Sequence, residues 1–518
     1  MFDSLPCLSP RLRRWLPAAM LAGVLTVAAS GLRPATPTLA AADSAPPAVD
    51  PHRAQPPTAV PTPTIPPAPP VTSGGDKPAD PRADPGAEPG AEPGAEDAKK
   101  GLQYLHGDNH ANIDRDYDKA FASFQAGAKL GNADCQYNLG MIFEDGRGLP
   151  KDPIQALQYL KLAAAQNHPG ALDELGVLAL QTLPNQAPDP AQVKEARARF
   201  LTAANLGYAP AQYNLGVLAL GGGGVPRDLT VACAWLTKAA AQKHAGAMVL
   251  LGQLAVKKRI PPVSEDQMLA WLEAPAQAKS VQACYLLGQW YDTQPADQRD
   301  MQKAQRWYTE AATLGNVDAM VRLGVIDHMG DGVIPDYNAA RDWLLKAQNA
   351  GSADAIFHRA GMYMLGHGET KDIDTALTLY FQAAQQGSVL ADYQLGMLYK
   401  DGFAAAKLKP DQEQAIGYFK AAADRGHEAS CWWLGFLYYH ESDQKKYLPL
   451  ALKYLEAAAE MGHTDAAWWT GVMYAQGYGT AVDSAKARSW LEVARKRGYP
   501  ADDQQMEATL KPLSAPPQ

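Results

Sequence analysis

The stretch 211-AQYNLGVLALGGGGVPRD-228 decides the fold, and it places an apolar run directly before four consecutive glycines, Gly221 to Gly224. A glycine-rich loop can hold a phosphate when a strand precedes it and a Lys-Ser/Thr pair follows it. Here Val-Pro-Arg-Asp follows, and the preceding residues have helical rather than strand spacing. We therefore interpret the four glycines as a turn between two helices.

The Leu215-Gly216 pair of this stretch recurs along the chain at intervals of 35 to 40 residues. An interval of this length is typical of an α-solenoid, in which each unit is one pair of helices. The equivalent glycines are Gly101, Gly140, Gly176, Gly216, Gly252, Gly288, Gly324, Gly361, Gly396, Gly435 and Gly471. The sequence therefore predicts about eleven helix-turn-helix repeats.

Each unit has the same order of signals. A first helix of small and apolar residues ends at glycine, and a turn follows that is often Gly-x-Gly, as at Gly146 and Gly148. An Asp such as Asp152 or Asp228 then caps a second helix, which usually stops at another glycine such as Gly207. No single pair can bury its own apolar face, so we expect the pairs to stack into an all-α, right-handed superhelical solenoid.

The ends of the chain differ in composition from this array. Arg13 and Arg14 precede an uncharged apolar run, which predicts an export signal, with an uncleaved inner-membrane anchor as the alternative. The Pro/Ala/Gly/Glu-rich region that follows has too little apolar surface to fold, so we expect a disordered, partly polyproline-like spacer. The predicted segments are 1–40 (signal), 41–97 (linker), 98–498 (solenoid), 499–513 (C-terminal capping helix) and 514–518 (tail).

Charge and motifs exclude several function classes. The net charge of -8 argues against a nucleic-acid binder, which needs a basic face. The sequence has no metalloprotease, Cys-x-x-Cys or Gly-x-Ser-x-Gly motif, so we predict no catalytic residues, no metal and no cofactor. Four histidines occupy equivalent positions just past a second helix, which indicates a repeat feature rather than a metal cluster: His168, His244, His427 and His463.

The run Ala211–Gly216, the Gly-x-Gly turns and the A-x-x-W-L-x-K-A-A pattern of Ala232–Ala240 together resemble the Sel1-like repeat family, a relative of the tetratricopeptide repeats. The resemblance implies an adaptor that binds proteins or peptides. Exported bacterial members resemble cell-envelope scaffolds, including assembly factors for exopolysaccharide secretion and partners of cell-wall enzymes. A cysteine-rich branch is linked to β-lactam binding or hydrolysis, but its paired cysteines are missing here. We expect Cys135, Cys233, Cys284 and Cys431 to be buried free thiols.

The position two residues before the aligned glycine is polar in many units, which suggests a solvent-facing stripe on the first helices. These helices line the concave surface of tetratricopeptide-like solenoids. Residues of the stripe are Asn138, Glu174, Asn214, Arg322, Arg359 and Gln394, and two later units carry Trp433 and Trp469 at the same position. We predict a basic patch at Arg322 and Arg359 and an aromatic patch at the two tryptophans. The alternatives are a solvated charged face and tryptophans packed in the core.

The leading hypothesis is an exported, non-catalytic scaffold that binds a protein or peptide along this groove, in the periplasm or cell envelope. Cell-wall enzymes and polysaccharide-secretion components are the partner classes that the resemblance implies. Contact with a membrane is expected only through an uncleaved N-terminal segment. The alternatives are an exopolysaccharide or peptidoglycan assembly factor that contacts glycan, and, less favoured, a β-lactamase-like hydrolase.

Overall fold

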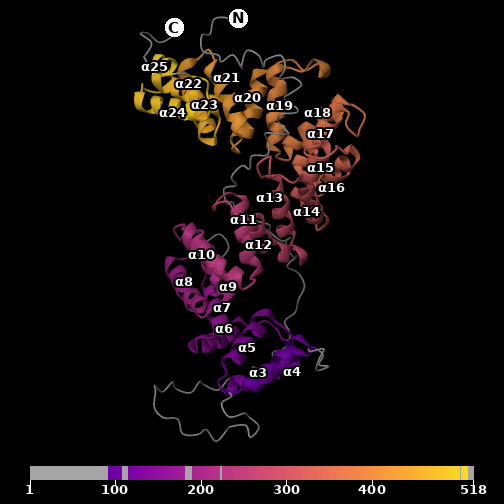
Figure 1. Cartoon of the computed structure of the whole chain (residues 1–518), viewed down its shortest axis with the longest axis vertical. Helices are drawn as coiled ribbons and strands as arrows, with labels where there is room; N and C mark the ends of the chain where they lie inside the picture. Colours follow the sequence, from indigo (N-terminus) through magenta and orange to yellow (C-terminus); the bar gives the residue numbers. More distant parts are fainter. Residues whose placement is uncertain (1–91, 108–114, 181–188, 222–224, 502, 511–518) are drawn as a thin grey trace, which may run out of the picture. The chain divides into compact units, whose positions relative to one another are not determined.

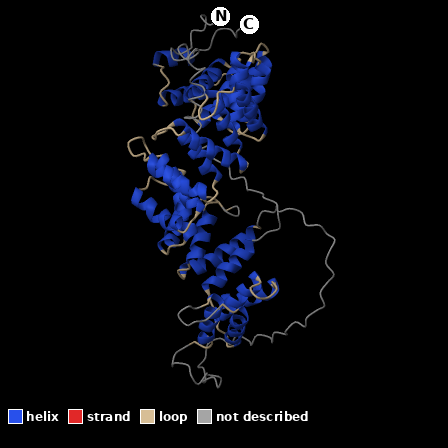
Figure 2. Ribbon diagram, turned by 90° about the vertical axis from the view of Figure 1, so that its right-hand side faces the viewer, coloured by secondary structure: helices blue, strands red, loops and turns tan. Residues whose placement is uncertain are grey.

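The computed structural model describes residues 92–107, 115–180, 189–221, 225–501 and 503–510. These residues form an array of α-helices (Figures 1 and 2), and no β-strand occurs among them. One isolated bridge joins Phe403 and Leu408 beside a short 3-10 helix. The all-α repeat fold predicted from the glycine spacing is therefore confirmed. The predicted signal, most of the linker and the tail lie outside the described residues.

The helices alternate between a first and a second helix of each repeat. The first helices are α3 (Ala95–His106), α5 (Ala133–Asp145), α7 (Pro169–Leu180), α9 (Ala209–Ala219), α11 (Ala245–Val256), α13 (Val281–Asp292), α15 (Val317–Met329), α17 (Ala353–Leu365), α19 (Val389–Asp401), α21 (Glu428–Tyr439) and α23 (Thr464–Gln476). The second helices are α4 (Tyr117–Lys129), α6 (Pro153–Ala165), α8 (Pro190–Asn205), α10 (Leu229–Ala241), α12 (Glu265–Gln277), α14 (Met301–Thr313), α16 (Tyr337–Asn349), α18 (Ile373–Gln385), α20 (Gln412–Ala423), α22 (Gln444–Met461) and α24 (Ser484–Lys496), while η2 (Ala404–Ala406) lies between α19 and α20.

Both ends of the array depart slightly from the predicted segments. Helix α3 begins at Ala95 rather than at residue 98, because Gly94 takes a left-handed φ of 77° and Glu96 and Asp97 place negative charge in the first helical turn. At the other end, α25 (Asp503–Leu510) packs against α23 and α24 within the predicted capping range. The side chain of Gln476 bonds the carbonyl of Thr509 at 2.9 Å, which fixes this last helix.

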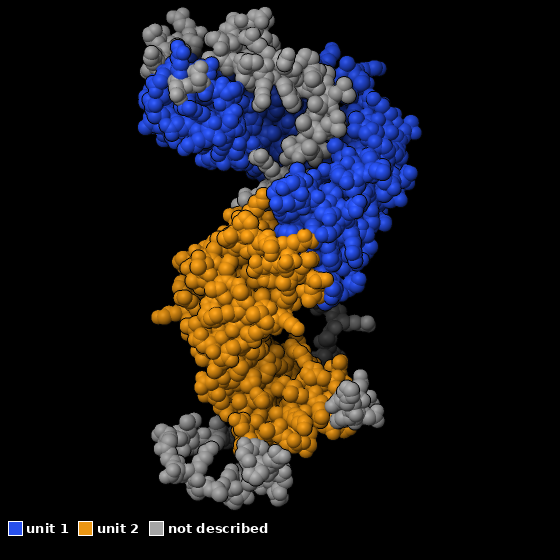
Figure 3. Space-filling model, viewed as in Figure 1, with its two compact units in different colours: residues 1–40, 276–518 blue, residues 41–275 orange. Residues whose placement is uncertain are grey.

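The chain divides into two compact units (Figure 3). One unit contains residues 41–275, and the other contains residues 276–518 together with residues 1–40. The C-terminal unit holds an extended hydrophobic cluster, which runs from Ala415 through the buried Trp432 and Trp468 to Met506. This cluster supports the first-helix surface described below.

The aligned glycines are explained by a close helix–helix contact inside each pair. A Cβ placed on Gly101 would lie 2.4 Å from the Phe124 ring, and one on Gly324 would lie 2.5 Å from Cγ of Leu344. In each pair the bulky neighbour comes from the second helix and is a Leu, Phe or Tyr. Glycine is thus required because an extra methyl group would collide with a buried side chain. Gly361 is the exception, since its nearest neighbour is the Tyr380 hydroxyl at 3.8 Å.

Gly324→Ala and Gly361→Ala should therefore change stability in opposite directions. The first substitution drives a methyl group into Leu344 and should lower the free energy of unfolding by about 1–3 kcal/mol. The second makes only an ordinary van der Waals contact with the Tyr380 hydroxyl and should raise it by up to about 1 kcal/mol, because alanine has the higher helix propensity. Urea unfolding followed by circular dichroism measures both, and equal losses at the two positions would contradict the packing explanation.

Helix ends use the residues that the sequence indicated. The Asp152 and Asp228 carboxylates accept hydrogen bonds from backbone N–H groups at the starts of α6 and α10. Gly207 takes φ of 89° after α8, in the left-handed region that glycine adopts without strain. Three repeats place another residue in this conformation: Asn167, Lys243 and Lys279. The left-handed backbone conformation at the end of the second helix is therefore kept in these repeats, even where another residue replaces glycine.

Candidate functional site

A group of half-buried aromatic side chains forms the candidate site on the C-terminal unit. We name it the aromatic wall and define it as Trp433, Phe436 and Tyr439 of α21 with Trp469 of α23 and Tyr478 of the following turn. Trp433 meets Phe436 edge-on, with ring centroids 5.8 Å apart. Tyr439 bridges the two repeats, at 5.2 Å from the Trp469 ring and 6.1 Å from the Tyr478 ring. The predicted aromatic patch thus contains more rings than the two tryptophans alone.

Neighbouring tryptophans on the same helices have different environments. Trp432 and Trp468 are 7% and 6% exposed, and they stack on the rings of His463 and Tyr499. Trp433 and Trp469 follow them by one residue and pack against the same core while remaining half-buried. One part of each wall ring is therefore fixed by the core and another part is accessible to a ligand, an arrangement favoured in binding surfaces.

The electrostatics around the wall are mild. Lys400 of α19 lies with its Nζ 4.3 Å from the centroid of the Trp433 ring and also pairs with the Asp401 carboxylate. The Tyr393 hydroxyl forms a hydrogen bond with Trp433, and burial raises the pKa of Tyr393 above its usual value. His440 is close to Phe436, with ring centroids 4.5 Å apart, and burial lowers its pKa. The wall therefore presents mainly neutral aromatic surface.

The predicted solvent-facing stripe is wrong at Arg322. This side chain is only 8% exposed and clamps the Asp292 carboxylate, with Nε to Oδ2 at 2.6 Å and Nη2 to Oδ1 at 2.8 Å. Arg299 bonds both Asp292 and Asp331, and the Tyr308 hydroxyl donates to Asp292. Burial by itself would raise the pKa of Asp292, but the two guanidinium groups hold it below its ordinary value. Arg322 therefore closes a charge cluster inside the repeats and does not form a basic surface patch with Arg359.

The other stripe residues have different surroundings. Gln394 is 7% exposed, so it too departs from the predicted stripe. Arg359 is half-buried, donates to Gln348 of α16 and lies 6.0 Å from the Tyr363 ring. In the N-terminal unit, Asn138 donates to the carbonyl of Asp134 at 2.8 Å, and Asn214 donates to Asp173 at 2.9 Å. Partner binding by any of these residues stays a prediction.

Sequence reasoning missed an acidic group on the first helices of the N-terminal unit. Burial raises the pKa of Glu174 to about 7, with further increases from Glu144, Asp173 and Asp145. Burial likewise raises the pKa of Asp173 to about 6, although its bond from Asn214 opposes the shift. Only Glu174 could have been noticed in the sequence, because it occupies the polar position two residues before an aligned glycine. The other carboxylates occupy different positions in their repeats.

The equivalent histidines have a structural role that explains their recurrence. Each accepts a backbone hydrogen bond at Nδ1 and so caps the next first helix, at 3.1 to 3.2 Å for His168, His244, His427 and His463. Each ring also lies against an aromatic residue of the preceding first helix, such as Trp432 against His463 at 4.8 Å. A histidine at this position therefore joins one repeat to the next.

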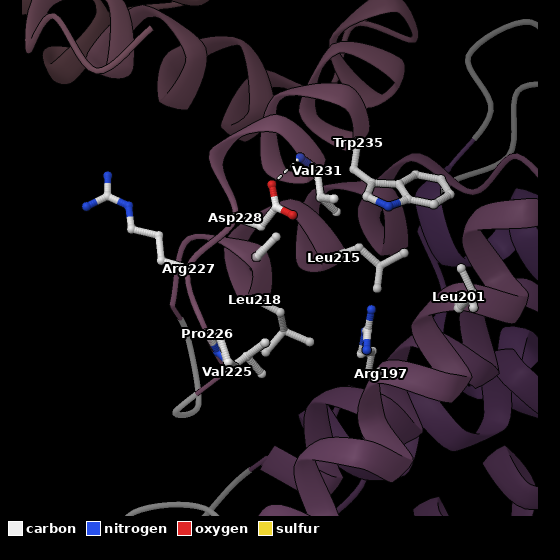
Figure 4. A pocket seen from close by; sticks show the side chains of 11 residues that line it. Arg197, Leu201, Leu215, Leu218, Val225, Pro226, Arg227, Asp228, Val231 and Trp235 are labelled. Carbon is white, nitrogen blue, oxygen red and sulfur yellow. Dashed lines mark hydrogen bonds between the residues drawn. The ribbon is translucent and has the colours of Figure 1, made fainter.

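A crevice of about 370 Å³ lies between α8, α9 and α10 in the N-terminal unit. Figure 4 shows Leu215, Leu218 and Trp235 around it, while Arg227 points away from the other labelled side chains. The Asp228 carboxylate beside it already caps α10 through the N–H of Val231 at 3.0 Å. The crevice therefore offers apolar surface rather than reactive groups. Gly221 lies in the turn between α9 and α10, and residues 222–224 of the four-glycine turn lie outside the described residues.

Within the described part of the chain, no group of three or more His, Cys, Asp or Glu residues is arranged to hold a metal. Cys135, Cys284 and Cys431 are buried free thiols as expected, whereas Cys233 is half-buried. Burial raises the pKa of the Cys135 thiol to about 12 and that of Cys431 to about 11, so neither is a thiolate at neutral pH. Among the same residues, none of the helices has the length and apolar character needed to cross a membrane.

Comparison with known proteins identifies the repeats. The Sel1 repeat model matches nine segments, at 101–132, 133–168, 209–244, 281–316, 317–352, 353–388, 389–427, 429–463 and 464–499. The helix pairs α7/α8 and α11/α12 fall outside these matches.

Two curated proteins and one solved structure illustrate the similarity. The chain is 39% identical over 59 residues to the chitin synthase regulator SKT5 of Saccharomyces cerevisiae, which covers 11% of this chain and 8% of that protein. It is 28% identical over 147 residues to an exopolysaccharide production negative regulator of Rhizobium leguminosarum bv. viciae, covering 26% of this chain and 55% of that protein. The chain thus spans about a twelfth and just over half of these relatives.

The solved structure is c5321, a protective antigen of uropathogenic Escherichia coli strains. It superimposes with a TM-score of 0.52 at 24% identity, covering 81% of this chain and 91% of that chain, and it has the same repeat fold. Proteins built from these repeats generally serve as interaction scaffolds and are generally non-catalytic. Because the repeat model matches more than half of the chain and the helix pairs recur at the matched positions, the chain belongs to the Sel1 repeat family.

Proposed function

We propose that this protein is an exported, non-catalytic scaffold that binds a protein or peptide partner through the aromatic wall. The wall is the observation that supports the proposal, because it joins accessible rings from two successive repeats on the first-helix face. Export to the periplasm or cell envelope is supported by the basic and apolar pattern of residues 1–40. The same segment, if retained, anchors the scaffold in the inner membrane.

The residues favour binding over catalysis. The wall offers hydrophobic area and aromatic faces, with one cation, Lys400, against the Trp433 ring. Rigid rings of this kind lose little conformational entropy on contact, and Trp and Tyr are the residues that most often dominate binding energy. A partner would therefore lie across α21 and α23 and take its affinity from Trp433 and Trp469.

Replacing both Trp433 and Trp469 with alanine should remove partner binding and leave the fold intact. The full-length protein is immobilised, exposed to a cell-envelope extract, and the retained proteins are quantified by mass spectrometry. We expect at least a tenfold loss of specifically retained partner, because each deleted ring is a candidate hot spot of about 2 kcal/mol or more. The melting temperature should fall by several degrees, since each ring packs partly against the core, so retention is measured at a temperature where circular dichroism shows both proteins to be folded.

Trp343→Ala provides the matched control. Trp343 is also half-buried and lies under a lysine, with Lys346 Nζ 4.1 Å from its ring centroid, but it belongs to the second helix α16. Partner retention by this variant should equal that of the wild type. Unchanged retention in the Trp433/Trp469 variant, or an equal loss in both variants, would refute the role of the wall.

A second candidate function is contact with an envelope polysaccharide. The same accessible rings are suited to stacking on sugars, and one relative is an exopolysaccharide production negative regulator. Titration of the purified protein with exopolysaccharide and peptidoglycan fragments, followed by tryptophan fluorescence, tests this candidate. Saturable quenching that disappears in the Trp433/Trp469 variant would support glycan binding over protein binding.

A further inference from the structure

The crevice between α8, α9 and α10 lies entirely within the N-terminal unit and has an apolar floor. The floor is formed by Leu215, Leu218 and Ala219 of α9, which are 5%, 5% and 8% exposed. Arg197 of α8 and Trp235 of α10 line its two sides. Its volume of about 370 Å³ is at the lower end of the range of ligand sites, and it is large enough for one aromatic side chain of a partner.

Other repeats fill the equivalent space with an aromatic ring of their own, from the third residue after the aligned glycine. In α5 this residue is Phe143, which meets Phe121 of α4 edge-on, with ring centroids 5.7 Å apart, and stacks on Tyr159 of α6 at 5.9 Å. In α19 it is Tyr399, which stacks on Tyr418 of α20 at 5.6 Å. An aromatic side chain at this register therefore packs against the second helices beside it.

The repeat of α9 and α10 lacks this ring, because the same register holds Ala219. Trp235 occupies the position of Tyr159, one residue before a buried Leu, and still offers an aromatic face. Arg197 occupies the position of Phe121, one residue after a buried Ala. The crevice therefore lacks one ring of the packing seen beside α5, and it has a guanidinium group where the second ring would be.

Arg197 brings an unbalanced positive charge to this apolar gap. Figure 4 shows its side chain extending from α8 toward Leu215, and it forms no hydrogen bond or ion pair with any other residue that the structure describes. The acidic groups nearby in sequence are engaged elsewhere, since Glu195 pairs with Arg199 and Asp228 caps α10. A carboxylate of an occupant would therefore meet a planar guanidinium group, which can form two parallel hydrogen bonds with it.

We propose that this crevice binds a peptide segment of a partner protein in which an aromatic side chain is flanked by acidic residues. The ring occupies the space that Phe143 fills in its own repeat and lies against Trp235, while a flanking carboxylate binds Arg197. Aromatic side chains that enter a pocket in this way often dominate the affinity of an interface. The site goes beyond the function proposed above, because it uses none of the residues of the aromatic wall.

The test uses the full-length protein and the peptide acetyl-Glu-X-Glu-amide, in which X is para-fluorophenylalanine. Fluorine NMR of the peptide reports binding, and we expect saturable shift and broadening with a dissociation constant of about 1 mM or below. The matched peptide acetyl-Gln-X-Gln-amide should bind about threefold more weakly or worse, because it has no carboxylate for Arg197.

Ala219→Phe closes the crevice from within, because Phe143 shows that the repeat accommodates a ring at this register. Peptide binding should fall about tenfold or more, while circular dichroism should show the helix content of the wild type. Ala255→Phe is the matched control, since it adds the same ring at the equivalent position of α11, and it should leave binding within about twofold. Arg197→Phe, at an exposed position, gives a second way to fill the gap and should also cost about tenfold.

Arg197→Gln tests the charge without filling the space. Binding of the Glu peptide should weaken about threefold to tenfold, and its advantage over the Gln peptide should disappear. Arg227→Gln is the control, because Figure 4 shows the Arg227 side chain pointing away from the other labelled residues. This variant should bind the Glu peptide within about twofold of the wild type.

Three results would overturn the proposal. The first is no saturable binding of the Glu peptide to the wild type up to about 5 mM. The second is equal binding to the wild type and to whichever crevice-filling variant folds. The third is binding of para-fluorophenylacetate as tight as that of the peptide, because the crevice would then take a free aromatic acid. None of these results bears on the proposed function, which is measured by partner retention through Trp433 and Trp469.

Discussion

Arg322→Ala is expected to lower the free energy of unfolding by about 3–5 kcal/mol, because it leaves the buried Asp292 carboxylate without its main partner. Asp292 is 6% exposed on its side chain and cannot recover the lost bonds from water. Arg299 remains within 2.7 Å of one carboxylate oxygen, but it is shared with Asp331. The loss should be concentrated in α13 to α15, where the cluster joins two repeats.

Arg359→Ala is the matched comparison, since Arg359 occupies the same register one repeat later. It is half-buried, and its described contacts are with Gln348 and Tyr363 rather than with a carboxylate, so its removal should cost less than about 1 kcal/mol. Arg322→Lys should fall between the two, because one ammonium group cannot place two nitrogens on Asp292. Chemical denaturation together with hydrogen exchange of α13 to α15 measures the series. A cost below 1 kcal/mol for Arg322→Ala would show that the cluster does not stabilise the fold.

Acidification should destabilise the C-terminal unit through its buried histidines. Burial lowers the pKa of His328, His358, His427 and His463 to about 4, and neighbouring charged groups contribute at His328 and His358. Each pKa is then lower in the folded state than its ordinary value of about 6.5, so the unfolded chain binds more protons between these two values. Stability is therefore retained above pH 6.5 and lost as the pH falls toward 4. At pH 5 each histidine contributes a loss on the order of 2 kcal/mol.

The double variant His427→Asn/His463→Asn isolates part of this effect. Asparagine already caps α5 and α15 at the equivalent positions Asn132 and Asn316, so the helix starts are preserved without a titrating group. The variant and the wild type should be similar at pH 7.5 and should differ by up to about 4 kcal/mol at pH 5, with the wild type less stable. Urea midpoints measured across this pH range provide the comparison. Parallel curves for the two proteins would mean that these histidines do not carry the pH dependence.

The histidine effect has to be measured against a variant, because buried carboxyl groups change the pH dependence of stability in the opposite direction. The pKa of Asp173 is raised to about 6 and that of Glu174 to about 7, mainly by burial. These groups bind more protons in the folded state, so their contribution to stability increases as the pH falls toward 4. They belong to α7 in the N-terminal unit, whereas His427 and His463 begin α21 and α23. Hydrogen exchange should therefore show that α7 and α21 respond to acid in opposite senses.

The sequence was sufficient to predict the repeat fold because its signals are local and repeated. The aligned glycines other than Gly361 meet a bulky side chain of the same pair, and the Asp and Gly caps act within a few residues of their own helix ends. A requirement of this kind leaves the same mark in every unit. It therefore remains visible at α7 and α11, where the repeat model finds no match.

The surface could not be predicted equally well, because the first-helix register does not determine exposure by itself. Arg322 and Arg359 are equivalent in sequence, but Arg322 is drawn inward by Asp292, which belongs to the preceding repeat. Trp433 is fixed between core and solvent by its neighbours Phe436, Tyr393 and Lys400, which come from two helices. The sequence register therefore predicted where aromatic and charged residues occur on the first helices. Contacts between repeats determine which of these side chains are exposed, and the register does not contain those contacts.

The division of contacts in the array has a consequence for how such chains change length. The tight fit between a glycine and its bulky neighbour is internal to one pair, whereas a capping histidine rests on a ring from the pair before it. Duplication or deletion of one whole pair leaves every internal fit untouched and creates a single new junction. That junction needs only a capping side chain and an aromatic ring against which it can pack. The array can therefore gain or lose whole helix pairs without disturbing the packing inside the remaining pairs.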